Sequence, residues 1–186
     1  MEILGLIVDK AARTFHVTGA HVAVGVISGL AVIVCALLHY EFMSITSRRL
    51  ALTLLPRRAR VLGLMMMMLI AHVLEVWIFA GIYWFLDKYP SLGHLDGPFE
   101  EGALDFIYFS AVAFTTVGFG DIVPMGAIRI LSGTECLVGF SLITWSASLA
   151  FLEMQSDWAE FRHPTLARRR RDDPPADQAS PPTNSD

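Results

Sequence analysis

Three long apolar segments constrain this chain more than any other feature of its sequence. They are Ala20–Met43, Val61–Leu86 and Met125–Met154. Each is long enough to cross a bilayer as a helix, which takes about 20 residues for a hydrocarbon core of ~30 Å. Of the 186 residues 54% are hydrophobic and only 17% are charged, a balance typical of membrane proteins and unlike that of soluble domains. The sequence therefore predicts an all-α membrane protein with three transmembrane helices.

A fourth apolar segment, Ala103–Phe114, is too short to cross the membrane. Its 12 residues, "ALDFIYFSAVAF", would rise only ~18 Å as a helix. Such a segment can enter the bilayer and return only where its backbone is buried in protein or lines a water-filled cavity. We expect a re-entrant helix between the second and third spans.

The distribution of arginine predicts the orientation of the chain. The loop 44–60 carries five arginines and no acid, and four more follow the third span at 168–171. Basic loops stay in the cytoplasm, so the N-terminus is expected outside and the C-terminus inside a cell (inner) membrane. The arginines between Arg48 and Arg60 are also candidates for binding anionic lipid. The tail 164–186, rich in proline, serine and acids, is expected to be disordered.

The short helix is followed by "TTVGFGD", residues 115–121. Glycine adopts positive φ without steric cost, so alternating glycines let successive carbonyl groups point the same way. If several copies surrounded an axis, these carbonyls would form rings, and rings of carbonyl oxygens replace the hydration shell of an alkali cation. The Thr116 hydroxyl would add one more oxygen. The pattern predicts a cation pathway built from backbone oxygens.

This motif resembles the selectivity filter of potassium channels. The order of elements from Val61 to Phe161 is similar to the two-helix pore module of that superfamily. The resemblance implies a homotetramer that conducts K⁺ passively through a tetrameric pore, with no catalytic residue, no cofactor and no enzyme activity. It also implies three regions: an N-terminal transmembrane helix with its basic loop (1–60), the pore module (61–163) and the cytoplasmic tail (164–186).

The same resemblance assigns site residues. The filter, where K⁺ would bind, comprises Thr116, Val117, Gly118, Phe119 and Gly120. Filter support falls to Thr115, Asp121, Tyr108 and Phe109, with the Tyr108 hydroxyl expected to donate to Asp121. The inner-helix hinge and cavity residues would be Gly139, Phe140, Ile143 and Ala147. One residue is missing between Pro124 and Arg129 relative to common members, which leaves the inner-helix register open by one.

Ionisable residues inside the spans also require an explanation, because they are costly in lipid. His72 and Glu75 share a helix face at a spacing of three, and Glu135 lies at a similar depth on the third span. Two interpretations stand: a buried hydrogen-bonded network that positions the helices, or a proton- or metal-sensitive gate acting near Gly139. His39 and Glu41 are expected at the cytoplasmic interface with their polar ends in water.

Two classes of function follow. The first is a potassium-selective channel. The second is a non-conducting membrane sensor or auxiliary subunit that keeps the pore fold. The intact filter motif favours the channel, because a non-conducting protein has no need of ordered carbonyl rings. The gating stimulus and the role of the first span are open at this level.

Overall fold

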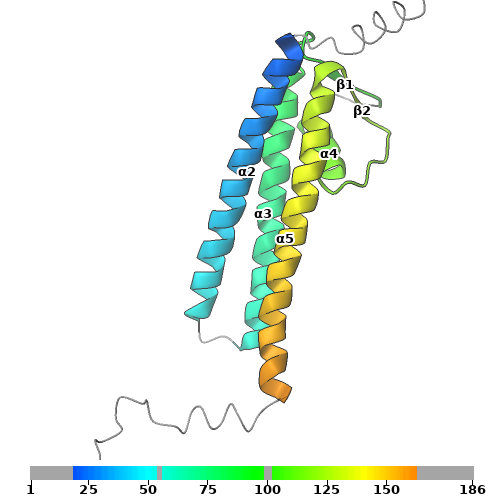
Figure 1. Cartoon of the computed structure of the whole chain (residues 1–186). Helices are drawn as coiled ribbons and strands as arrows, with labels where there is room; N and C mark the ends of the chain where they lie inside the picture. The colour runs from blue at the N-terminus through cyan, green and yellow to red at the C-terminus, as the bar shows by residue number, and fades with distance from the viewer. Residues whose placement is uncertain (1–18, 54–55, 99–101, 163–186) are drawn as a thin grey trace, which may run out of the picture.

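Three long helices lie side by side in the computed structural model, which describes residues 19–53, 56–98 and 102–162 (Figure 1). They are α2 (Gly19–Ala51), α3 (Arg57–Leu86) and α5 (Arg129–Arg162). Each contains a stretch that is long and apolar enough to cross a membrane. The short helix α4 (Ala103–Phe114) packs against both α3 and α5 near one end of this bundle. The expected all-α membrane fold, with three long helices and a shorter fourth, is confirmed.

Helix α2 packs through a narrow stripe of mostly small residues. The stripe is Val24, Ser28, Ala31, Cys35 and His39, all buried and spaced three or four residues apart. Small side chains let helices approach closely in a membrane, where apolar burial alone drives little association. Its apolar members belong to the same buried cluster as Val76 and Phe79 of α3 and Leu131 of α5. The first helix is thus part of one core with the other two.

Most of the basic stretch 44–60 belongs to the end of α2 and the start of α3, which corrects the expectation of a loop there. Helix α2 continues through Arg48 and Arg49, which lie in its last turn. Basic side chains there interact favourably with the negative end of the helix dipole. Pro56 then precedes the first turn of α3 and fixes an extended backbone at φ −60° and ψ 145°. Only residues 52–56 connect the two helices.

A small antiparallel sheet joins the loop between α3 and α4 to the segment that follows the filter motif. Strand β1 (His94–Asp96) pairs with β2 (Val123–Met125), and Leu95 lies opposite Pro124. Gly93 and Gly97 flank β1 at φ 115° and 144°. A Cβ on Gly97 would overlap the Asp121 carbonyl oxygen, so only glycine fits this approach. After β2 a single 3₁₀ turn, η1 (Gly126–Ile128), leads into α5.

Several sequence-based expectations concern other parts of the chain. The tail 164–186, for which the sequence predicts disorder, lies outside the described residues, as do the arginines at 168–171 and the N-terminal residues 1–18.

Candidate functional site

The end of α4 and the start of the filter motif are held together by backbone hydrogen bonds. Thr116 N–H donates to the Ala113 carbonyl at 2.9 Å, and Val117 and Gly118 N–H both approach the Val112 carbonyl, at 3.1 and 3.4 Å. No peptide bond is cis in the described residues, so each N–H points opposite to the carbonyl of the preceding residue. The Thr116 and Val117 carbonyls therefore both point away from the end of α4.

The backbone dihedral φ alternates in sign along the motif. Thr116, Gly118 and Gly120 have φ of 59°, 58° and 79°. For a β-branched residue such as Thr116 this conformation is strained, and strain of this kind persists only where surrounding contacts enforce it. Among the described residues Thr116 is the only non-glycine with positive φ. Gly118 and Gly120 thus both adopt the positive φ that the sequence predicts for them.

All residues from Thr115 to Asp121 are exposed in the single chain. Val117 and Phe119 are apolar, yet 55% and 69% of their surfaces are accessible. One copy of this segment can offer a cation only one wall of a site, because its carbonyls line a single strand of backbone. The exposed apolar side chains require a covering, either lipid or further copies of the chain.

Tyr108 on α4 braces the far end of the motif. Its hydroxyl donates a hydrogen bond to Asp121 Oδ2 at 2.7 Å, the contact expected from the sequence. This hydrogen bond lowers the pKa of the Asp121 carboxyl below its ordinary value, because it favours the charged form. Thr115 lies at the other end of the motif and donates through its hydroxyl to the Ala111 carbonyl at 2.7 Å.

A second polar network lies on the opposite side of α4. Tyr83 of α3 donates to Glu135 Oε2 at 2.6 Å, and its ring meets that of Phe109 edge-on at 5.0 Å. Ser110 Oγ lies 2.5 Å from Glu135 Oε1 and 2.8 Å from the Val76 carbonyl oxygen. One hydroxyl hydrogen cannot serve both oxygens. Both contacts are satisfied when Glu135 is a neutral acid: its carboxyl hydrogen is donated to Ser110, and the Ser110 hydrogen is donated to the Val76 carbonyl.

Gly139 marks the place where α5 meets the end of α4. A Cβ at this position would overlap the Phe114 carbonyl oxygen, so the backbones touch there. The structure thus gives Gly139 a packing reason, in addition to the hinge role that the resemblance suggests. Beyond it, Phe140, Ile143 and Ala147 are exposed on α5 of the single chain.

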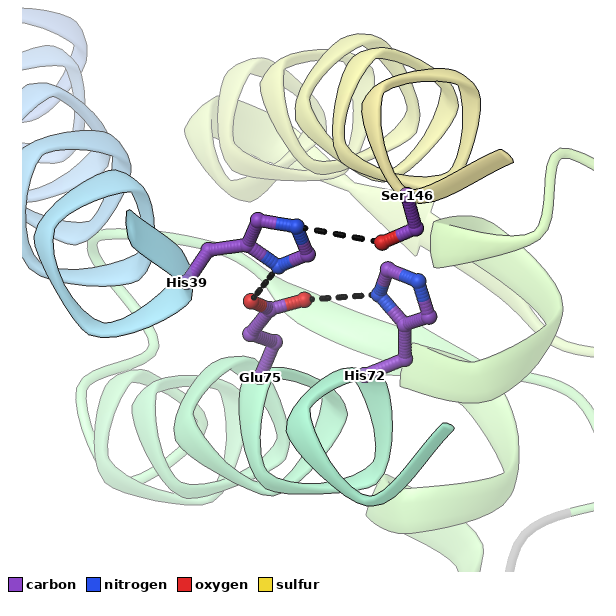
Figure 2. Close-up of polar contacts among 4 residues, drawn as sticks. All are labelled: His39, His72, Glu75 and Ser146. Atoms are coloured by element: carbon purple, nitrogen blue, oxygen red, sulfur yellow. Dashed lines mark hydrogen bonds and ion pairs between the residues drawn. The ribbon is translucent and has the colours of Figure 1, made fainter. Parts of the chain in front are cut away.

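Glu75 lies at the centre of a third network, which Figure 2 shows. His39 Nδ1 is 2.8 Å from Glu75 Oε1, and His72 Nδ1 is 3.0 Å from Glu75 Oε2. His39 Nε2 also lies 3.1 Å from the Ser146 hydroxyl of α5. The expectation that His39 sits at the interface in water is wrong: the side chain is fully buried. The physical reason is that a buried carboxylate in lipid needs partners, and α2 supplies one.

The proposed grouping of His72, Glu75 and Glu135 therefore divides in two. Glu75 bonds to two histidines, whereas Glu135 bonds to Tyr83 and Ser110. His39 was missed as a partner because it lies near the end of the expected first span. Its spacing of four from Cys35, on a stripe of small residues, was the signal that could have identified it as buried. Glu41, two residues on, is exposed.

Comparisons with known proteins agree with this arrangement. Residues 71–155 match the family described as "Ion channel". Over 56 residues the chain is 36% identical to two pore potassium channel b of Oryza sativa subsp. japonica. That stretch is 30% of this chain and spans 16% of the rice protein's length. No solved structure gave a significant match. The family match covers α4, the filter motif, the second half of α3 and most of α5, and together with the rice relative it supports a relation to the potassium channel superfamily.

Proposed function

We propose that this protein is a potassium-selective channel that conducts K⁺ passively through residues 116–120. The observation that carries the proposal is the backbone of that segment. Its φ alternates to positive values at Thr116, Gly118 and Gly120, and two of its carbonyls are turned away from α4 by the bonds to Val112. Backbone oxygens aligned in this way are the ligands that replace water around K⁺.

The pore is proposed to be a homotetramer. Each chain contributes one exposed filter strand, so four copies around an axis would complete each carbonyl ring. The exposed side chains of Phe140, Ile143 and Ala147 would then face the cavity below the filter, and Val117 and Phe119 would be covered by neighbouring copies. Residues 61–163 would form this pore module, with 1–60 and 164–186 as flanking regions.

The membrane arrangement follows from charge. We place the protein in the cell (inner) membrane with the N-terminal end of α2 outside and the C-terminal end of α5 in the cytoplasm. The β1–β2 sheet then lies at the outer mouth. Arg48, Arg49, Arg58 and Arg60 would lie at the inner surface, where they can bind anionic lipid headgroups. Neither a cofactor nor an enzymatic step is part of the proposal.

The test is K⁺-driven flux into liposomes that hold the purified full-length protein. We expect flux that Ba²⁺ blocks and that Na⁺ cannot replace. Gly118→Ala should abolish it, since φ 58° disfavours any side chain. Gly29→Ala is the matched control, because a Cβ there meets nothing within 4 Å. Equal K⁺ and Na⁺ flux would overturn the selectivity. Absence of flux from correctly folded protein at all pH values tested, with divalent cations removed, would favour the non-conducting sensor or subunit.

A further inference from the structure

The buried group around Glu75 has the composition of a metal site. His39 comes from α2, and His72 and Glu75 come from successive turns of α3 (Figure 2). One ligand atom from each of the three residues lies within 4.8 Å of the other two. His39 and Glu75 are fully buried, and 15% of the His72 side chain is accessible. Three ligand-type side chains therefore converge in a part of the molecule where an isolated polar group is expensive.

The three coordinating side chains limit which metal ion this site can bind. Two imidazoles and a carboxylate form the three-residue set that holds zinc with a fourth position open. Imidazole nitrogen suits transition metals, whereas Mg²⁺ and Ca²⁺ prefer sites made of oxygens alone. In a tetrahedral zinc site the ligand atoms lie roughly 3.3 Å apart, given Zn–N distances of about 2.0–2.1 Å. His39 Nδ1 and His72 Nδ1 lie 2.8 and 3.0 Å from the two different oxygens of Glu75, so an ion among these atoms would replace the two hydrogen bonds and spread the groups slightly.

Ser146 supports the metal-binding form of His39. Neighbouring hydroxyl residues on α5, such as Thr144 and Ser148, donate back to carbonyls of their own helix. Ser146 instead meets His39 Nε2 at 3.1 Å. When its oxygen accepts the Nε2–H, Nδ1 carries the free lone pair that a metal requires. A partner on the far nitrogen is the usual way in which proteins orient a ligating histidine.

We propose that His39, His72 and Glu75 bind one divalent transition metal per chain, with Zn²⁺ the best chemical match. The metal would tie α2 to α3 and, through Ser146, reach α5. It enters past His72, the one ligand of the three with accessible surface. The His72 ring also lies 5.9 Å from that of Phe114, the last residue of α4. The metal would therefore sit one residue away from the helix that carries the filter.

The experiment titrates the purified, chelator-stripped full-length protein in detergent with Co²⁺ and then with Zn²⁺. The pH is kept mildly alkaline, where free imidazole is neutral. We expect the visible absorption of four-coordinate Co²⁺ to saturate at one ion per chain and to vanish when Zn²⁺ replaces it. The assay needs no ion flux, so it stands or falls separately from the channel proposal. A folded protein that takes up neither ion would overturn the site.

Substitutions identify the ligands. His39→Gln, His72→Gln and Glu75→Gln should each weaken Zn²⁺ binding by more than the roughly 10–100-fold that loss of a supporting group costs, and Ser146→Ala by about that range. His94→Gln is the matched control, because His94 is exposed on β1. Unchanged affinity in all three ligand variants would overturn the proposal.

If a variant fails to fold, the wild-type protein still tests the site. X-ray absorption of the Zn²⁺-loaded protein should show two imidazoles and at least one oxygen ligand, and Zn²⁺ should raise its unfolding temperature. A spectrum without imidazole would place the metal elsewhere.

Discussion

Two acids in this molecule accept hydrogen bonds from tyrosine hydroxyls, but in different surroundings. The Tyr108 hydroxyl donates to the exposed Asp121, and the Tyr83 hydroxyl donates to the buried Glu135. The first interaction is in contact with solvent and favours a carboxylate. The second lies in the apolar interior and fits a neutral acid. Both tyrosines donate to their acids, so the difference in charge comes from burial and not from the hydroxyl groups.

Tyr108→Phe should loosen the outer end of the filter. Asp121 has a lowered pKa in the folded protein, so the stability it contributes is present at neutral pH and is lost only as the pH falls through that lowered value. Without the hydroxyl this contribution is lost, and the pKa returns toward its ordinary value of about 4, so Asp121 takes up its proton at a higher pH. In liposomes we expect a weaker preference for K⁺ over Na⁺. We also expect the decrease of K⁺ flux at acidic pH to begin at a higher pH. Tyr89→Phe, on an exposed tyrosine of the outer loop, should change neither.

Glu135→Gln should be well tolerated, because an amide can donate to Ser110 and accept from Tyr83 as the neutral acid does. Glu135→Leu keeps the volume but leaves the buried Tyr83 hydroxyl without its acceptor, a loss of about 1–3 kcal/mol. Thermal unfolding in detergent distinguishes the two. A glutamine variant as unstable as the leucine variant, or one whose flux has a new pH dependence, would show that the ionised carboxylate matters and would support the gate.

At the scale of elements, α4 is the part that its neighbours hold most closely. Ser110 and Glu135 tie it to α3 and α5, and Gly139 lets its last carbonyl touch α5. The filter motif then continues from a helix that is held by both α3 and α5. Its position depends on backbone contacts that admit no extra atom.

Gly139→Ala should therefore displace α4. The added Cβ overlaps the Phe114 carbonyl, and overpacking of this kind costs about 1–3 kcal/mol. We expect a lower unfolding temperature and loss of K⁺ flux. Gly133→Ala lies on the same helix, where a Cβ meets nothing within 4 Å, and it should gain slightly in stability from helix propensity. Normal flux from the Gly139 variant would mean that α5 can shift without disturbing the filter.

The elements were predictable from the sequence to different degrees. Helix α4 was expected over the residues that form it, since an apolar run of half-membrane length has few alternatives. The end of α2 was misplaced because arginines after an apolar run suggest a loop, although they also suit a helix terminus. Strands β1 and β2 have three residues each, too few to leave a periodic signal. The His39–Glu75 contact joins positions 36 apart, which depends on how the helices pack.

For the whole molecule, the exposed filter segment predicts assembly. Native mass spectrometry of the detergent-solubilised protein should detect a complex with the mass of four 20.6 kDa chains. Cross-linking in membranes should give a ladder that stops at four. A protein that stays monomeric in both measurements would contradict the tetramer, since a single chain leaves residues 115–121 uncovered.

The stripe on α2 affects the design of chimeric proteins that use part of this chain. The family match begins at residue 71, which invites a chimera that starts at α3 and omits what comes before. Such a cassette would lose His39 and turn Glu75 toward lipid tails, where an unpartnered acid is poorly tolerated. A transplant that keeps α2 retains the acid's partner. In this protein the smallest portable unit therefore comprises α2 together with α3, α4 and α5.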